Sequence, residues 1–415
     1  MGLKNLQLIF DNPQRTYYSG QTVSGRLVVA LDSPKNLRSI IIKFKGEAEC
    51  KWEETRTVER DGKSETETDY YRGYELYFEN RVKVFGGSNE TETLPAGEYC
   101  YQFNMILPNN LPSSFEGKYG YIRYTVKATL DRPWKFDHDV KAAFTVLSHV
   151  DLNSDPQNRE PFKAEDSKMF CCCCCESGPL TLATHLPTRG FVPGQSIPMT
   201  IEVDNASNVR IYGVSCELIK IVTYYSQHPR RSKEDRVTVT SMNLDGAVEE
   251  NGSKTWCKKM DIPPLPPSQL RECSVIDLEY SLKIKAKPEG MHNDLKNSFR
   301  ITIGTIPLWQ TPAVPQPATT PYVPPLEMAG GFTTMPQADP CFEPSAPPYP
   351  DLPPPTYEES TFGTTNISDS GDNKYLFGES AYSPRYPTYS LQAASSSNVA
   401  IGWAAPPKYE DAATK

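Results

Sequence analysis

Long apolar runs are missing from this 415-residue chain. A transmembrane helix needs about 18 or more consecutive apolar residues, and no such stretch is present. The first residues, MGLKNL, contain neither an apolar signal-peptide core nor the Ser or Thr that N-myristoylation requires. We therefore expect a soluble, cytoplasmic protein.

Catalytic motifs are also missing. The sequence contains no glycine-rich phosphate loop and no nucleophile elbow. Its five histidines are isolated from one another: His138, His149, His185, His228 and His292. The sequence predicts no enzyme activity, no cofactor and no metal site.

Cysteines are scattered except in one run: Cys171, Cys172, Cys173, Cys174 and Cys175. Because the other six are spread over a long chain, reduced thiols fit better than a disulfide scaffold. Consecutive cysteines cannot wrap one tetrahedral zinc ion. Two interpretations stay open: reversible S-acylation, which would anchor the protein at a membrane, and small strand residues that alternate between buried and exposed.

Charge separates the chain into a body and a tail. Residues 307–415 hold 20 of the 38 prolines but only four basic residues against 11 acidic ones. Such a segment cannot bury enough apolar surface to offset the entropy of ordering, so we predict a disordered tail over 307–415. The body is nearly neutral, with 39 basic and 40 acidic residues, which argues against nucleic acid as a partner.

The body has the pattern of β-strands. Short segments rich in Val, Ile, Tyr and Phe are interrupted by Gly, Pro, Asn or Asp, and no long amphipathic helix is evident. The Asp61-Gly62 pair indicates a hairpin turn. Expected strands include residues 23–31, 39–46, 74–84, 98–107, 120–130 and 141–146.

An internal repeat divides the body in two. The segment YSGQTV at 18–23 recurs as VPGQSI at 192–197, and each copy precedes two apolar strands. We therefore predict an all-β body of two tandem immunoglobulin-like sandwiches. The expected boundaries are 1–150 for the first sandwich, 151–170 for a linker and 171–306 for the second.

Several spaced segments resemble the alpha-arrestin family. In the first half they are LPNNLPSSFE at 107–116, GKYGYIRYTVKA at 117–128 and DRPW at 131–134. In the second half they are IPPLPPS at 262–268 and VIDLEYSL at 275–282. The resemblance covers residues 6–306 and implies two arrestin-type sandwiches that dock partners rather than catalyse a reaction.

The tail holds two Pro-Pro-x-Tyr motifs, the pattern that WW domains bind: Pro354, Pro355 and Tyr357, and Pro406, Pro407 and Tyr409. Paired prolines pre-form a polyproline II segment for an aromatic groove, and the tyrosine fills a second apolar pocket. Two copies allow avidity with tandem WW domains. The family resemblance implies that the WW domains binding these motifs belong to a HECT-type E3 ubiquitin ligase.

Two shorter motifs precede the first WW-binding motif. One resembles the tetrapeptide bound by ESCRT-I: Pro344, Ser345, Ala346 and Pro347. The other resembles the short ALIX-binding motif: Tyr349, Pro350 and Leu352. They make ESCRT-I and ALIX candidate partners.

Two further features bear on partner binding. The basic stretch at 228–233, HPRRSK, is expected to be a solvated hairpin tip, with binding to phosphate or acidic lipid as the alternative. The thioredoxin-interacting branch of the family has a cysteine three residues before a tryptophan, where this chain has Ser253 before Trp256. That difference, despite the nearby Cys273, speaks against a mixed disulfide with thioredoxin.

The leading hypothesis is an adaptor that brings ubiquitin ligases to transmembrane receptors or transporters, at the plasma membrane and endosomes. Ubiquitination, endocytosis and endosomal sorting of the cargo would follow. The alternatives are an ESCRT-recruiting scaffold for vesicle budding at the plasma membrane and a thioredoxin-binding metabolic regulator.

Overall fold

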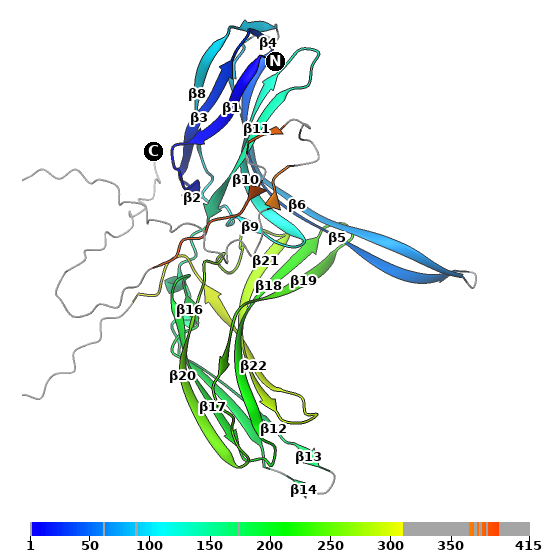
Figure 1. Cartoon of the computed structure of the whole chain (residues 1–415), viewed down its shortest axis with the longest axis vertical. Coiled ribbons are helices and arrows are strands. Elements are labelled where there is room, and N and C mark those ends of the chain that lie inside the picture. Colours follow the sequence, from blue (N-terminus) through cyan, green and yellow to red (C-terminus); the bar gives the residue numbers. More distant parts are fainter. Residues whose placement is uncertain are drawn as a thin grey trace, which may run out of the picture.

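A computed structural model shows two β-sandwiches, the N-terminal one above the C-terminal one in Figure 1. The structure describes residues 2–60, 63–87, 90–172, 175–176, 178–309, 365–368, 372, 376–378 and 381–389. Within these residues the helical segments are two 3-10 turns, Leu152–Ser154 and Pro156–Asn158. The predicted all-β body of two sandwiches is confirmed.

The N-terminal sandwich packs a three-stranded sheet on a larger one. The smaller sheet has the order β1 (Leu3–Phe10), β3 (Thr22–Leu31), β8 (Gly97–Ile106). The larger has the order β2 (Thr16–Tyr18), β11 (His138–Leu147), β10 (Gly120–Asp131), β5 (Ser39–Arg60), β6 (Lys63–Phe85). Short additions are β9 (Phe115–Glu116), which pairs with β10, and the pair β4 (Lys35–Leu37) and β7 (Glu92–Leu94).

The C-terminal sandwich repeats this plan. One sheet has the order β12 (Phe162–Lys168), β15 (Leu180–Leu186), β17 (Ser196–Asn205), β20 (Gly252–Asp261). The other has the order β16 (Gly190–Phe191), β22 (Leu295–Ile303), β21 (Ile276–Pro288), β18 (Ile211–Ser226), β19 (Arg231–Leu244). The strand β12 lies within the expected linker, 151–170. Its exposed, charged outer residues give an edge strand that hydrophobic alternation does not reveal.

The repeated YSGQTV and VPGQSI segments form the same turn twice. Gly20 and Gly194 have φ of 83° and 87°, a left-handed conformation that glycine adopts without strain. In each copy the glutamine side chain accepts from a backbone N–H three residues earlier, at 2.9 Å for both Gln21 and Gln195. The sequence repeat is therefore also a repeat of hydrogen bonding.

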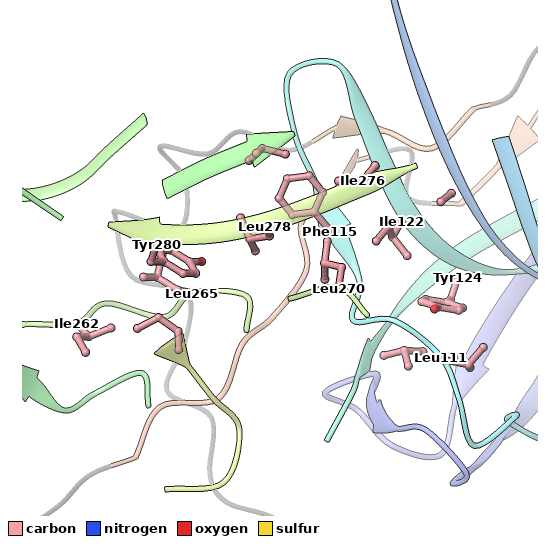
Figure 2. Close-up of a cluster of buried hydrophobic side chains, with 14 of the residues drawn as sticks. Leu111, Phe115, Ile122, Tyr124, Ile262, Leu265, Leu270, Ile276, Leu278 and Tyr280 are labelled. Carbon is pink, nitrogen blue, oxygen red and sulfur yellow. The ribbon is translucent and has the colours of Figure 1, made fainter. Parts of the chain in front are cut away.

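One continuous cluster of buried apolar side chains runs through both sandwiches. Where they meet, Leu111 and Phe115 from the first sandwich face Leu270 and Ile276 from the second (Figure 2). All four side chains are at most 2 % exposed. The hydrophobic effect therefore holds the two domains together as well as each domain separately.

The longest hairpin also ties the domains together. The strands β5 and β6 pair from Ile40 to Arg60 and extend beyond the sandwich, far past the expected ranges 39–46 and 74–84 (Figure 1). On β6, the backbone of Tyr74 exchanges two hydrogen bonds, of 3.2 and 3.1 Å, with the Gln227 side chain of the C-terminal sandwich. The Ser274 N–H donates to Glu75 over 3.0 Å. This hairpin is part of the domain interface.

Candidate functional site

The outer face of β10 and β11 is polar yet buried. Alternate residues of these strands point away from the core, including Arg123 and Lys127 on β10 and Lys141 and Thr145 on β11. Arg123, Lys141 and Thr145 are only 5 %, 3 % and 2 % exposed. Charged residues are buried at this level only when something covers and pairs them.

Residues from the tail cover this face, and we call the described residues 365–368, 372, 376–378 and 381–389 the strap (orange in Figure 1). Its strand β24 (Leu376–Phe377) pairs in parallel with Asp139 and Val140 of β11. The strand β2 pairs with the other half of the same β11 edge. The strap thus extends the sheet by strand addition where β2 leaves the edge open.

Two lysines hold the middle of the strap. Lys141 Nζ donates to the Ile367 carbonyl over 2.7 Å and lies 3.0 Å from Asp372 Oδ2. Lys127 Nζ lies 2.8 Å from Asp372 Oδ1 and 3.0 Å from Asp139. Burial lowers the pKa of Lys127, but its bonds to Asp372 and Asp139 outweigh burial and raise it overall. The Ile367 side chain is 1 % exposed, so an apolar anchor accompanies the ion pairs.

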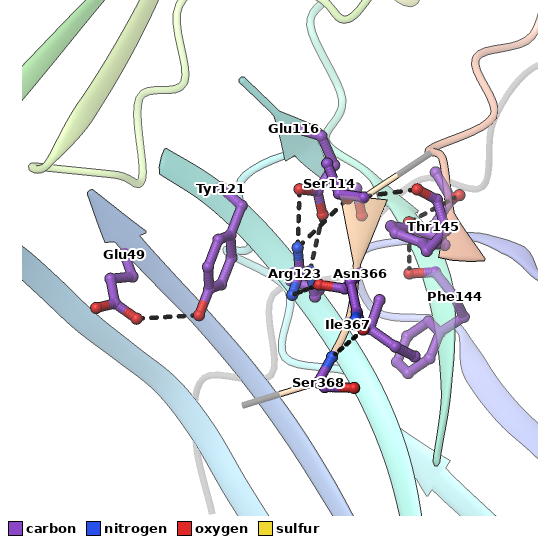
Figure 3. Close-up of polar contacts among 12 residues, drawn as sticks. Glu49, Ser114, Glu116, Tyr121, Arg123, Phe144, Thr145, Asn366, Ile367 and Ser368 are labelled. Carbon is purple, nitrogen blue, oxygen red and sulfur yellow. Dashed lines mark hydrogen bonds and ion pairs between the residues drawn. The ribbon is translucent and has the colours of Figure 1, made fainter. Parts of the chain in front are cut away.

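An arginine joins the body to the start of the strap (Figure 3). Arg123 donates to both carboxylate oxygens of Glu116, over 2.8 and 2.9 Å. The same guanidinium lies 3.4 Å from the Asn366 carbonyl and from Thr365 Oγ1. Burial raises the pKa of Glu116, although the bond from Arg123 opposes the shift.

Three tyrosines fix the end of the strap. Tyr382 Oη donates to the Phe144 carbonyl over 3.1 Å, and Tyr386 Oη donates to the Ser114 carbonyl over 3.0 Å. Tyr389 reaches the other domain, where its hydroxyl donates to the Thr305 carbonyl. The strap therefore contacts both sandwiches, although all its residues fall in the tail expected to be disordered. Composition averaged over 307–415 hides this short segment.

The candidate tail motifs lie outside the described residues. This holds for both WW-binding motifs, with Tyr357 and Tyr409, and for the ESCRT-I and ALIX candidates at 344–347 and 349–352. The strap lies between the two WW-binding motifs in the sequence. Three of its anchors, Arg123, Lys127 and Lys141, were not predicted, since a polar strand face normally indicates solvent. Asp372 was not predicted because it falls in the tail expected to be disordered.

The two ends of the cysteine run form short paired strands at the far end of the C-terminal sandwich (Figure 1). The strands β13 (Cys171–Cys172) and β14 (Cys175–Glu176) pair antiparallel, with Cys172 opposite Cys175. Cys173 and Cys174 lie outside the described residues. Acylation of the run stays a prediction.

The basic stretch at 228–233 spans the turn after β18 and the first residues of β19, so the predicted hairpin tip is confirmed. It approaches the β5–β6 hairpin, where Arg231 and Lys233 each lie 3.9 Å from a Glu54 carboxylate oxygen. Glu54 therefore balances part of its charge.

A cavity of about 830 Å³ opens between the sandwiches, lined in part by β18 and β19. Among its lining residues are Phe115, Lys118, Lys220, Tyr224 and Asp235. Burial lowers the pKa of Lys220 to about 8, although Asp235 opposes the shift. The cavity thus contains a buried lysine whose pKa is well below the ordinary value.

Cys273 is poorly suited to thiol exchange. Ser253 and Trp256 lie on β20, while Cys273 is in the loop before β21. Burial raises the pKa of Cys273 to about 11, which keeps it in the unreactive thiol form.

No helix among the described residues is long and apolar enough to cross a membrane. Over the same ranges, no group of three or more His, Cys, Asp or Glu side chains is placed to hold a metal ion.

Comparison with known proteins agrees with this architecture. Residues 6–153 match the family model "Arrestin (or S-antigen), N-terminal domain", and residues 176–308 match "Arrestin (or S-antigen), C-terminal domain". Arrestin domain-containing protein 17 of Caenorhabditis elegans is 28 % identical over 93 % of this chain and 99 % of its own length. Human arrestin domain-containing protein 4 is 30 % identical, over 74 % of this chain and 72 % of its own. Human arrestin domain-containing protein 1 is 28 % identical over 84 % of this chain and 72 % of its own length. The chain therefore belongs to the alpha-arrestin family, whose arrestin domains support an adaptor-type role.

Proposed function

We propose that this protein links transmembrane cargo to WW-domain HECT-type E3 ubiquitin ligases and so promotes cargo ubiquitination, endocytosis and endosomal sorting. The main support is the pair of Pro-Pro-x-Tyr motifs, ending at Tyr357 and Tyr409, in a tail attached to two arrestin sandwiches. Each motif supplies a pre-formed polyproline II segment and an aromatic anchor. The protein would act in the cytoplasm and be recruited to plasma membrane and endosomes.

The strap gives this proposal a geometric basis. Because the strap contacts the N-terminal sandwich, the tail is attached to the body between the two motifs. A ligase bound to either motif is thereby kept close to the arrestin domains and to cargo docked on them. Short tethers of this kind raise the effective concentration of the second partner.

The test is a pull-down from cell lysate with the intact chain and with a Tyr357→Ala, Tyr409→Ala double variant. We expect the double variant to lose HECT ligases and ubiquitin on bound membrane proteins. Tyr322→Ala, in the tail but outside every motif, is the matched control. Persistent ligase binding in the double variant would show that the WW-binding motifs are not the attachment points.

ESCRT-I and ALIX are proposed as additional tail partners, through Pro344 to Pro347 and through Tyr349, Pro350 and Leu352. A Pro344→Ala, Ala346→Asp variant separates budding from cargo sorting. Loss of vesicle release with intact cargo degradation would favour the budding scaffold, whereas the reverse would favour the ligase adaptor. We do not propose a thioredoxin complex, because Ser253 stands where the thioredoxin-interacting branch has a cysteine, and the half-buried Cys273 thiol has a raised pKa.

A further inference from the structure

Two strap tyrosines use their hydroxyl groups as donors to the backbone of the N-terminal sandwich. Tyr386 donates to the carbonyl of Ser114, a residue with no exposed surface. Tyr382 donates to the Phe144 carbonyl and lies 3.2 Å from Thr145 Oγ1. Burial raises the pKa of the Tyr382 hydroxyl to about 12. Both side chains are half-buried in the docked strap, and their hydroxyl groups bind as neutral donors.

We propose that Tyr382 and Tyr386 are phosphorylation sites, and that phosphate on either one keeps the strap off the N-terminal sandwich. A tyrosine kinase would transfer the γ-phosphoryl group of ATP to the phenolic oxygen. The new O–P bond replaces the bond to the ADP oxygen, and the phenolic proton is released. The modified side chain has no hydroxyl hydrogen left to donate and carries about −1.5 to −2 charges.

The surroundings of these phenols oppose such a charge. Glu116 is near enough to both hydroxyls to raise their pKa values, after the larger effect of burial. Arg123 is a nearby cation, but Glu116 already accepts two hydrogen bonds from it. A phosphate would also leave the Ser114 carbonyl without its donor. Buried acceptors without donors and buried charges without partners are both destabilising.

Docking and modification therefore exclude each other. While the strap is docked, the phenols face carbonyl groups of the body and are closed to a kinase. The kinase modifies the released strap, and the added phosphate prevents the strap from docking again. By linkage, whatever releases the strap should speed phosphorylation.

The test places phosphotyrosine at position 386, or at 382, of the full chain with an expanded genetic code. Hydrogen exchange is then measured over residues 138–147 and 376–389. We expect protection of both segments to fall by tenfold or more. Phosphotyrosine at Tyr322, outside the strap and the motifs, is the control and should leave protection unchanged. Tyr386→Phe, which removes the donor without adding charge, should give a smaller loss.

Unchanged or increased protection in the protein phosphorylated at 386 would overturn the proposal, because the phosphate would then be compatible with a docked strap. A second measurement uses the unmodified chain, a purified broad-specificity tyrosine kinase and ATP. An Asp372→Asn variant, which loses the lysine ion pairs, should be phosphorylated at 382 and 386 several-fold faster than the parent. Equal rates would show that docking does not protect these tyrosines.

Discussion

Tyr124 and Tyr280 occupy equivalent places in the two sandwiches. Each has no exposed surface, and each donates its hydroxyl hydrogen to a proline carbonyl: Tyr124 to Pro112 over 2.7 Å, and Tyr280 to Pro266 over 2.8 Å. The two prolines belong to LPSS and LPPS loops, which the sequence analysis singled out without relating them to the tyrosines. The duplicated domains thus share a buried tyrosine-to-proline hydrogen bond as well as a turn.

Removing this hydrogen bond should destabilise either sandwich. Tyr124→Phe and Tyr280→Phe keep the ring but leave a proline carbonyl without its donor, so we expect each to lower the free energy of unfolding by about 1–2 kcal/mol. Urea denaturation followed by circular dichroism measures the change. Tyr70→Phe, at a side chain that is 68 % exposed, should have almost no effect. A loss of similar size at Tyr70 would contradict the assignment.

The ion pairs of Asp372 should control strap docking. Asp372→Asn removes the charge shared by Lys127 and Lys141, and we expect protection against hydrogen exchange at 376–378 to drop by roughly 1–3 kcal/mol. In the double variant with Lys141→Met, the loss of protection should be smaller than the sum of the two single losses, because the two residues form one network. Glu165→Gln breaks an exposed pair with Lys163 and serves as the control. Full additivity would exclude the direct contact.

Gly73 should be required at the domain interface. A Cβ atom there would lie 2.3 Å from the Tyr225 carbonyl and 2.9 Å from Cys50 Sγ, so Gly73→Ala must displace β6 from the C-terminal sandwich. We expect a loss of about 1–3 kcal/mol in stability, with increased exchange around Gln227. Gly213→Ala, on a strand where a Cβ atom meets nothing within 4 Å, is the matched control. Equal stability of the two variants would refute this expectation.

Lys220 should make stability depend on pH. Its pKa falls from an ordinary value near 10.5 to about 8, so the unfolded chain binds the proton more tightly between these values. Stability therefore rises with pH from about 8 to 10.5, and the cost of burying the charge, roughly 3 kcal/mol, is fully present below about pH 8. Lys220→Met should stabilise the protein at pH 7 and lose that advantage by pH 10. Urea titrations at both pH values measure the difference in free energy of unfolding between the variant and the parent. A pH-independent difference would point to packing alone.

Thiol reactivity should follow burial. Burial raises the pKa of Cys50 to about 11 and of Cys216 to about 12, whereas Cys100 and Cys257 are exposed. Since the thiolate is the nucleophile, iodoacetamide at pH 7.5 should label the exposed pair at least tenfold faster. Mass spectrometry of labelled peptides provides the rates, and labelling in urea should equalise them. Rapid labelling of Cys216 in the native protein would contradict its burial.

Sequence patterns were reliable where the deciding forces are local. Every second residue of β17 is buried, from Ile197 to Val203, as the alternation of apolar residues predicts. The glycines of the repeated turns were also identifiable, since only backbone conformation is at stake. Strand lengths were less predictable: the outer part of β5 and β6 is polar and Thr-rich, and its extended pairing is not marked by an apolar face.

The sequence by itself determined the two all-β domains, the repeat that relates them and the tail motifs, because short-range periodicity and peptide chemistry specify these features. Only the tertiary structure decided that the strap contacts the body. The Lys141 to Ile367 bond joins residues 226 positions apart. Arg123, Lys127 and Lys141 have the same alternation as residues that face solvent. Whether such a polar face stays open to water or accepts a segment of the tail depends on which groups the fold brings together, and local sequence does not record that.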